Sequence, residues 1–473
     1  MKVAFKTLGC KLNYSETSSI SREFVKKGYE KVSFDDASDI YVINTCSVTQ
    51  NADKEFKYLV NRVKRKNPNS SVVAIGCYAQ LKPKKISEIP GVDLVLGADK
   101  KFDILNYLNL EDQDNNNIHS CEINSVDFFK SSYSLGDRTR SFLKVQDGCD
   151  YKCTYCTIPQ ARGKSRSGTI SELLDNVKYL VASGVKEIVL TGVNIGDYGI
   201  FDTKTKKRET NFYELISNID LIPDLNRVRI SSIEPNLLSD EIIQFVHNSN
   251  SFVKHFHIPL QSGSDKILKL MKRRYLKNLY ISRINKIKEL MPDCCIGVDV
   301  IVGFPGETEE DFNETYEFLK ALNISYLHVF SYSERDNTES LKINHKIPKK
   351  IRAIRSQILR KLSDKKKIKF YKSNINQIRP VLFESKNYDG YIYGYTDNYI
   401  RVKTLWSKNL VDNVVDCELI KIDDGIIVIK IVENPIIQSV QINGIEEDNI
   451  YQNIKEITSK IEKYPFVKSK INE

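Results

Sequence analysis

The sequence lacks any continuous apolar run of the about 18 residues that a transmembrane helix requires. Its first residues, MKVAFKTLGCKLN, also lack the apolar core of a secretory signal peptide. We therefore expect a cytoplasmic protein with no membrane partner. Thiols stay reduced in that compartment, so the ten cysteines are expected to be free thiols or metal ligands rather than disulfides.

A fourth metal ligand is missing from the segment DGCDYKCTYCTIP, residues 147–159. Cys149, Cys153 and Cys156 stand four and then three residues apart, and the nearest sequence offers no further Cys or His. Gly148, Pro159 and the surrounding Thr and Tyr disfavour a helix there. A structural zinc site needs four ligands, whereas a cubane iron–sulfur cluster held by three thiolates keeps one iron open. We therefore predict such a cluster.

A second set of three cysteines follows from the N-terminal pattern, in which residues 1–108 alternate predicted strands and helices. Three of these strands end in a cysteine, namely Cys10, Cys46 and Cys77. Alternating strands and helices favour a parallel sheet, and parallel strands place their carboxyl ends at one edge. The three thiols are therefore expected to converge on one site.

The rest of the chain divides by pattern into further segments. Residues 109–138 are polar and predict a linker. Residues 139–370 repeat strand and helix about six times, which predicts a parallel barrel with the three-cysteine loop at its mouth. This segment ends in KKIRAIRSQILRKLSDKKKIKF, a basic helix on which Ile351, Ile354, Ile358 and Leu362 form the predicted apolar face; the basic face is either solvated or a phosphate-binding surface.

The C-terminal part changes character. Residues 371–435 alternate apolar and polar residues between Gly, Asp and Asn turns, which predicts a small antiparallel β-barrel. Several Tyr and Trp406 stand among Lys and Arg there, a composition that suits stacking on nucleic acid bases. Residues 436–473 predict one helix and no task. The whole is thus an α/β multidomain protein.

These motifs resemble the radical S-adenosylmethionine (SAM) methylthiotransferases over about residues 1–435. The resemblance rests on the Cys-x3-Cys-x2-Cys loop with Tyr155 before its last cysteine, on the three N-terminal cysteines, and on the small C-terminal barrel, which in the family is a TRAM-like RNA-binding module. TLGCKLNYSET and NTCSVTQNADKEF look most like the branch that acts on N6-threonylcarbamoyladenosine at tRNA position 37.

The resemblance implies a mechanism and its cofactors. It implies two [4Fe–4S] clusters, one on Cys149, Cys153 and Cys156 and one on Cys10, Cys46 and Cys77, together with SAM and an electron donor. One SAM provides a methyl group and a second the 5′-deoxyadenosyl radical that removes hydrogen from C2 of the adenine. No catalytic His–carboxylate pair is expected, because C2 carries no acidic proton. His255 and His257 are accordingly interpreted as structural.

The resemblance and the strand ends also indicate which residues meet the ligands. The expected SAM-binding residues lie at the ends of barrel strands or in the cluster loop: Tyr155, Gly192, Asn194, Glu234, Gln261, Ser262 and Gly303. The expected contacts to the anticodon loop follow the cluster loop: Arg162, Lys164 and Arg166. Two other interpretations stay open. One is the same chemistry on isopentenyladenosine-37 or a ribosomal protein, and the other is a non-catalytic, zinc-stabilised RNA-binding protein.

Overall fold

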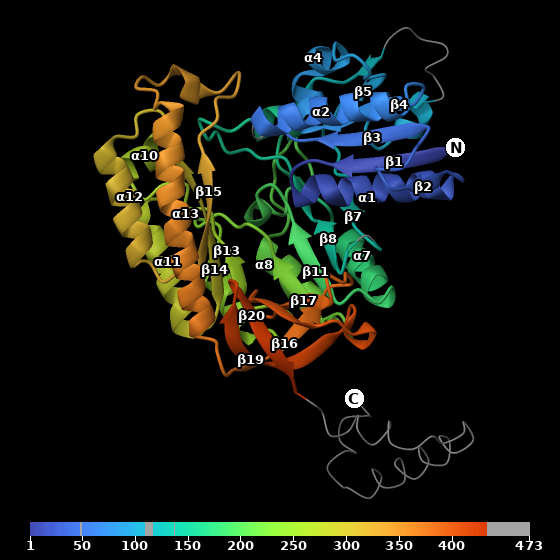
Figure 1. The fold of residues 1–473 in the computed structure, drawn as a ribbon. Coiled ribbons are helices and arrows are strands. Elements are labelled where there is room, and N and C mark those ends of the chain that lie inside the picture. The colour runs from blue at the N-terminus through green and yellow to red at the C-terminus, as the bar shows by residue number, and fades with distance from the viewer. Residues whose placement is uncertain (48–49, 109–116, 137, 433–473) are drawn as a thin grey trace, which may run out of the picture. The chain divides into compact units, whose positions relative to one another are not determined.

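Six parallel strands form the N-terminal sheet, in the order β2-β1-β3-β4-β5-β6. The computed structural model describes residues 1–47, 50–108, 117–136 and 138–432, so the predicted C-terminal helix lies outside the described residues. Figure 1 shows the elements of this sheet at the N-terminal end of the chain. Their bounds are β1 Lys2–Thr7, α1 Lys11–Lys26, β2 Glu30–Val32, β3 Ile40–Thr45, α2 Gln50–Lys66, β4 Ser71–Gly76, α3 Cys77–Leu81, α4 Pro83–Ser87, β5 Leu94–Leu96, α5 Ile104–Leu108 and β6 Ile118–His119.

Alternating side chains give this sheet two apolar faces. Ala4, Tyr41 and Val72 pack with Phe56 of α2 on one face. Residues of the opposite parity, such as Val3 and Val42, pack with Phe24 of α1 on the other face. Because both faces are covered, β3 and β4 are apolar along most of their length. The predicted parallel α/β domain is confirmed, with β2 and β6 as additional edge strands.

The central domain is a partial barrel of six parallel strands. A first sheet has the order β12-β11-β8-β7 and a second the order β13-β14-β15. Parallel bridges from Val228 to Phe252 and from Ser232 to His257 connect the two sheets. The strands are β7 Ser132–Tyr133, β8 Arg140–Lys144, β9 Gln146–Asp147, β10 Arg166–Ser167, β11 Glu187–Thr191, β12 Arg227–Ile230, β13 His255–His257, β14 Cys295–Val302 and β15 Tyr326–Ser331. The six predicted barrel strands correspond to β8 and β11–β15.

Helices cover the outside of this barrel and form its core against the strands. The helix α12 begins with a capping box in which Thr308 and Asp311 satisfy each other's backbone amides. The helices are η1 Ile123–Ser125, α6 Ile158–Arg162, α7 Ile170–Ala182, η2 Ile195–Asp197, α8 Phe212–Asp220, α9 Asp240–Asn248, α10 Asp265–Leu270, α11 Lys277–Leu290, α12 Glu309–Ala321, η3 Glu339–Lys342 and α13 Lys349–Lys372.

The predicted linker has structure of its own. Ile118–His119 adds β6 to the edge of the N-terminal sheet, parallel to β5. Ser132–Tyr133 forms β7 and pairs antiparallel with β8 of the barrel. These pairings are long-range, which is why a polar sequence gave no local sign of them. Residues 109–116 lie outside the described residues.

The basic helix α13 forms as predicted and Leu362 is buried as expected, but the other three residues of the predicted apolar face are not. Ile351, Ile354 and Ile358 are exposed, whereas Leu359 and Leu362 are buried together with Arg352 and Arg355. The two arginines are buried because Glu334, Glu307 and Glu309 neutralise them. The ion pairs of Arg352 and Arg355 therefore determine which face of the helix is buried, and this is not the face that the spacing of the isoleucines predicts.

The C-terminal barrel is closed by five strands in the order β16-β17-β18-β20-β19. Most neighbours are antiparallel, but β18 and β20 pair in parallel, so the barrel is mixed rather than purely antiparallel as predicted. Its bounds are β16 Ile378–Phe383, β17 Tyr391–Thr396, β18 Arg401–Leu405, η4 Lys408–Leu410, β19 Val414–Asp423 and β20 Ile426–Ile431. Within the described part of the chain, no helix combines the length and apolarity needed to cross a bilayer.

Candidate active site

The three-cysteine loop lies at the carboxyl ends of the barrel strands, after β9. Cys149, Cys153 and Cys156 line one cavity of about 290 Å³. Gly148 precedes them with φ of +70°, and an added Cβ there would collide with the Lys164 backbone, so glycine is required at the start of the loop. The loop is not helical at the cysteines, and α6 begins only at Ile158. The predicted loop conformation is confirmed.

The environment of these thiols favours their neutral form until a metal replaces the proton. Burial, together with the neighbouring thiols, raises the pKa of Cys149 and of Cys156 to about 12. Burial also raises the pKa of Cys153, against the lowering effect of Arg273. Metal binding must therefore release protons from all three residues.

Arg273 connects this loop to the barrel strands, and sequence reasoning missed it. Its Nη1 donates to Cys153 Sγ at 3.1 Å and to the Tyr155 hydroxyl at 3.4 Å. Its other amino group pairs with Glu234. Tyr155 also packs edge-to-face against Phe304. Arg273 comes from the turn after α10, remote in sequence, so no local motif announced it.

The second set of cysteines converges at one sheet edge, as predicted. Cys10 precedes α1, Cys46 follows β3 and Cys77 begins α3. Strands β1, β3 and β4 are adjacent, and Thr45 pairs in register with Gly76, which places the residues after these strands side by side. A Cβ on Gly9 would lie within 2.8 Å of Cys46 Sγ, so the backbone beside Cys10 approaches Cys46 closely.

A buried ion network joins the two cysteine sets. Glu16 of α1 accepts hydrogen bonds from Arg162, Lys101 and Lys144, at 3.1, 2.7 and 3.1 Å respectively. Asp147 in turn accepts hydrogen bonds from Arg162 at 2.9 Å. Three cations around one buried carboxylate satisfy it fully, which is the condition for burying such charges. The helix after Cys156 is thus fixed to the helix after Cys10.

This network corrects the prediction for Arg162 and Arg166. Both guanidinium groups are buried, and their hydrogen bonds go to carboxylates, to the Asn13 amide or to backbone carbonyl groups of the chain itself. They hold the loop rather than present a charge to RNA. Lys164 alone of the three expected RNA contacts lines a cavity, the one that contains the first cysteine set.

The expected SAM-binding residues fall into two groups. Gln261 lines a cavity of about 250 Å³ together with Tyr155 and Cys156, and its backbone is held at φ of +70°. Such strain costs about 1 kcal/mol or more and is concentrated at functional sites. Asn194 is buried, and neither polar atom of its side chain has a hydrogen-bond partner among the described residues. Both observations fit a polar ligand that completes the site.

Other expected residues are occupied by the chain itself. The Ser262 hydroxyl contacts Thr315 Oγ1 at 3.3 Å and accepts from the Ser264 amide. Gly303 has φ of +73°, and an added Cβ would collide with Arg352 of α13. A Cβ on Gly192 would come within 3.0 Å of Gln146 Oε1. These turns hold the strand ends in place, and a direct SAM contact from them stays a prediction.

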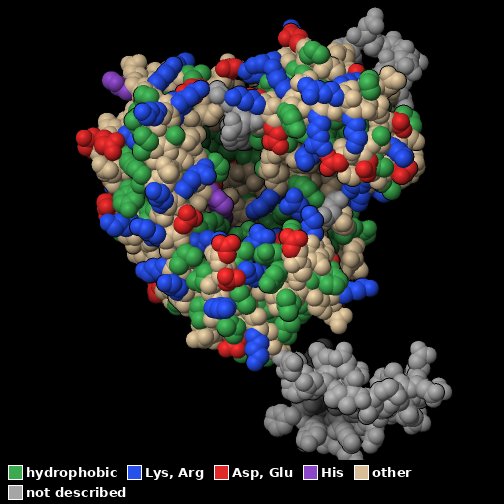
Figure 2. Space-filling view, in the orientation of Figure 1, with side chains coloured by type: hydrophobic (Ala, Val, Ile, Leu, Met, Phe, Trp, Pro, Cys, Tyr) green, Lys and Arg blue, Asp and Glu red, His purple; other side chains and the backbone are tan. Residues whose placement is uncertain are grey.

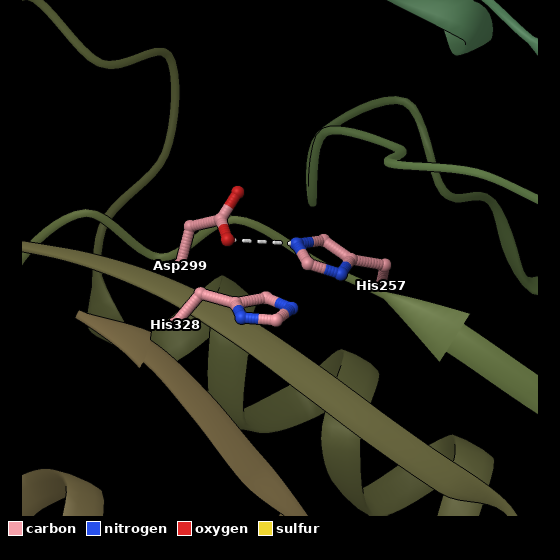
Figure 3. Close-up of side chains that lie close together, drawn as sticks. All are labelled: His257, Asp299 and His328. Atoms are coloured by element: carbon pink, nitrogen blue, oxygen red, sulfur yellow. Dashed lines mark ion pairs between the residues drawn. The ribbon is translucent and has the colours of Figure 1, made fainter. Parts of the chain in front are cut away.

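The interior face of the barrel carries polar side chains. The strand residues in the main core pack toward the helices. The alternate residues face the interior, and they include His257, Asp299 and His328 from β13, β14 and β15 (Figure 3). His257 Nε2 lies 2.9 Å from Asp299 Oδ1, and the His257 and His328 rings stack with centroids 5.2 Å apart. The interpretation of His257 as structural therefore misses its place in the interior.

The interior of the central barrel opens to solvent between the barrel and the N-terminal sheet. Figure 2 shows a hollow on this face, with Lys and Arg side chains around it and a His side chain at its edge. Partial desolvation lowers the pKa of His328, with a further contribution from His257. The imidazole is therefore neutral near pH 7 and can accept or donate a hydrogen bond.

Two family models match the chain. The radical SAM superfamily model matches residues 143–319, and the model of uncharacterized protein family UPF0004 matches residues 2–97. Each match coincides with one cysteine set. The first covers the barrel with Cys149, Cys153 and Cys156, and the second covers the sheet with Cys10, Cys46 and Cys77.

Curated relatives are similar over nearly the whole chain. The threonylcarbamoyladenosine tRNA methylthiotransferase MtaB of Bacillus subtilis is 38% identical over 89% of this chain and 94% of its own length. The protein of the same name from Aquifex aeolicus is 40% identical over 85% of this chain and 96% of its own. The chain belongs to the radical SAM methylthiotransferase family. A tRNA-2-methylthio-N(6)-dimethylallyladenosine synthase of Clostridium tetani is 33% identical over 88% of this chain and 93% of its own.

A solved structure supports the fold of this methylthiotransferase. The radical SAM methyltransferase TsrM of Kitasatospora setae superposes with a TM-score of 0.53 at 13% identity, covering 70% of this chain and 72% of its own. At that identity the likeness shows the fold alone. Membership of the family makes the chain an enzyme and implies a [4Fe–4S] cluster and SAM.

The donor set fits clusters better than a single ion. Within the described ranges, only His257, Asp299 and His328 bring three candidate ligand atoms within 4.8 Å of one another. Neither cysteine set closes to that spacing. The ligand atoms of a single zinc ion must lie that close to one another because they share one metal ion. In a cubane cluster each thiolate binds a different iron, so the thiolates stand farther apart. The spacing therefore argues against the zinc-stabilised alternative.

Proposed function

We propose that this methylthiotransferase inserts a methylthio group at C2 of N6-threonylcarbamoyladenosine at position 37 of tRNA. The observation that carries the proposal is the similarity, at 38–40% identity over most of both chains, to two enzymes named for that substrate. The buried Glu16–Arg162 pair supports it, because it joins the two cysteine sets that the proposed reaction would use on one substrate base.

Each cysteine set has one role in this proposal. Cys149, Cys153 and Cys156 hold the [4Fe–4S] cluster of the radical SAM site, and Cys10, Cys46 and Cys77 hold a second one. When bound, these groups supply reductive cleavage of SAM and the sulfur atom that is transferred. The chain itself holds the two sites at a fixed separation through the Glu16 network.

SAM is held by side chains at the strand ends. Asn194 offers an amide whose donor and acceptor are both free among the described residues. Tyr155 and Gln261 line the adjoining cavity. Glu234 is paired with Arg273, which also touches Cys153, so this pair orients the cluster loop relative to the cavity.

The tRNA meets the C-terminal barrel, and the basic helix α13 adds phosphate contacts. Tyr388, Tyr391 and Trp406 are 38–41% exposed on that barrel and can stack on bases. Lys361 and Lys365 of α13 are exposed and lie on its solvent side. An anticodon loop presents unstacked bases, so little stacking energy is lost when the base at position 37 enters the central barrel.

Mass spectrometry of tRNA nucleosides tests the function. Cells lacking their own t6A methylthiotransferase should regain the methylthio form of threonylcarbamoyladenosine when they express this chain. The Cys153→Ala variant should leave the unmethylthiolated nucleoside. If instead only isopentenyladenosine gains the methylthio group, the family stands and the proposed substrate is wrong.

A further inference from the structure

A further pocket lies beside Cys10, apart from the cavity of the first cysteine set. Its volume is about 270 Å³. It is lined by the turn that carries Cys10, by residues of barrel strands β8, β11 and β12, and by Tyr399 of the C-terminal barrel. Three parts of the chain that are remote in sequence therefore meet at one place.

The lining is rich in cations. It contains Lys11, Arg138, Arg140 and Arg229 against a single carboxylate, Glu187. Arg229 pairs with Glu187 at 2.8 Å, and Arg140 with Glu384, outside the lining, at 3.0 Å. Among the described residues, no carboxylate forms an ion pair with Lys11 or Arg138. Neither cation therefore has a carboxylate in direct contact, and Glu187 and Asp299 attract Lys11 only from farther away.

Arg229 adds to this positively charged lining a hydrogen-bond donor that has no partner in the described part of the chain. Its side chain is almost wholly buried, and its Nη1 has no hydrogen-bond partner in the described part of the chain. An unsatisfied buried donor of a charged group is expensive, so such groups are normally paired. Here the partner is missing at the wall of a pocket.

Aromatic rings fix the guanidinium groups in place. Arg138 lies over Tyr14 at 4.4 Å, Arg140 over Tyr395 at 4.6 Å, and Arg229 over Tyr399 at 4.5 Å from the ring centroids. Each contact restrains a long side chain without neutralising its charge. The pocket is therefore a preorganised anion site, because its donors need no ordering when the anion enters.

We propose that this pocket binds the carboxylate of the threonylcarbamoyl group on N6 of the substrate adenine. The proposal rests on the proposed function and assigns its substrate specificity. In adenine only N1 separates C2 from C6, so a base whose C2 reaches the site at Cys10 has its N6 substituent beside Lys11. A carboxylate in this pocket can form ion pairs with Lys11 and Arg138, whereas an uncharged isopentenyl group leaves both cations unpaired.

Binding of three anticodon stem-loops to the reconstituted enzyme tests this assignment. The loops carry threonylcarbamoyladenosine, its carboxylate methyl ester, or plain adenosine at position 37. The double variant Lys11→Met, Arg138→Gln should bind the first loop about 10- to 100-fold more weakly, the loss of one or two charge-assisted hydrogen bonds. It should bind the ester and plain loops as the wild type does.

Matched variants separate charge from damage. Lys178→Met removes an exposed charge on α7 and should change none of the three affinities. Lys11→Arg, Arg138→Lys keeps the charges and should restore preference for the free carboxylate. An equal loss on all three loops would instead assign the pocket to a backbone phosphate and overturn the proposal.

Failure of this inference and failure of the proposed function give different results. If the wild type methylthiolates threonylcarbamoyladenosine and its methyl ester equally well, the pocket assignment fails and the function stands. If the wild type methylthiolates only isopentenyladenosine, the function fails, and the anion assignment fails with it.

Discussion

The Glu16 carboxylate accepts a hydrogen bond of 3.1 Å from Arg162 Nη1, and both side chains are buried. Through this contact the helix that follows Cys10 is joined to the helix that follows Cys156. The two cysteine sets come from different domains of the chain, so this pair fixes their separation.

Replacing Glu16 by Gln should destabilise the fold strongly. The change leaves Arg162, Lys101 and Lys144 with fewer counter-charges in a buried site. Breaking a buried ion pair by removing one partner costs about 3–5 kcal/mol, which chemical denaturation can measure. Glu23→Gln, which breaks an exposed pair with Lys26, should leave the unfolding free energy unchanged.

The same substitution should alter the acid sensitivity of the protein. Burial raises the pKa of Glu16, but Arg162, Lys101 and Lys144 outweigh it and hold the pKa well below 4.5. The stabilisation by the carboxylate is therefore present above about pH 4.5 and is lost as pH falls toward the lowered folded value. The difference in unfolding free energy between wild type and Glu16→Gln should become smaller as the pH falls below 4.5. A difference that does not change with pH would contradict the assigned ionisation of Glu16.

Single cysteine variants should separate the two clusters by iron content. The wild type should bind about eight irons after anaerobic reconstitution, and Cys153→Ala and Cys46→Ala about four each. Cys153→Ala should abolish SAM cleavage, whereas Cys46→Ala should keep cleavage and lose sulfur insertion. Cys294→Ala removes a buried cysteine outside both sets and should retain all eight. Methylthiolation by Cys46→Ala would refute the role of the N-terminal domain.

Removing the Arg273 side chain should make the radical SAM cluster harder to reduce. Arg273 donates to Cys153 Sγ at 3.1 Å, and hydrogen bonds to cluster sulfur ligands raise the reduction potential. A redox titration followed by electron paramagnetic resonance should show a more negative midpoint for Arg273→Met. Arg274→Met is the matched control, because Arg274 stacks on Tyr151 instead. Equal shifts in both variants would point to a general loss of charge.

Two substitutions on α13 should distinguish its buried face from its exposed one. Leu359 has no exposed surface, and Leu359→Ala should lower the unfolding free energy by about 2–5 kcal/mol. Ile354 is 45% exposed, and Ile354→Ala should have little effect. Urea denaturation of both variants checks the orientation of the helix. The reverse order would restore the face expected from isoleucine spacing.

Trp406→Ala should weaken tRNA binding without affecting SAM. A base stacked on an aromatic side chain contributes about 1–3 kcal/mol, equivalent to about a 5- to 150-fold change in Kd. Fluorescence anisotropy with tRNA gives the Kd, and SAM cleavage without RNA should be unchanged. Leu405→Ala removes the still more exposed neighbour, which cannot stack, and should leave the Kd unchanged.

The sequence by itself determined the alternation of strands and helices, both cysteine sets and the family. Cys149, Cys153 and Cys156 are close in sequence, so their spacing alone indicated a cluster. Cys10, Cys46 and Cys77 are remote from one another, but each follows a strand, and parallel strands end at one edge. Local patterns were sufficient wherever a local rule fixes a three-dimensional position.

Only the tertiary structure decided which charges are buried and which side chains face the barrel interior. Arg162 and Arg166 look like RNA contacts in sequence, yet Asp147 and Glu16, from other elements, draw them inward. Arg273 reaches Cys153 across 120 residues, and Arg229 reaches Tyr399 from another domain. Such electrostatic pairings depend on distances between remote segments, and no periodicity in the chain encodes those distances.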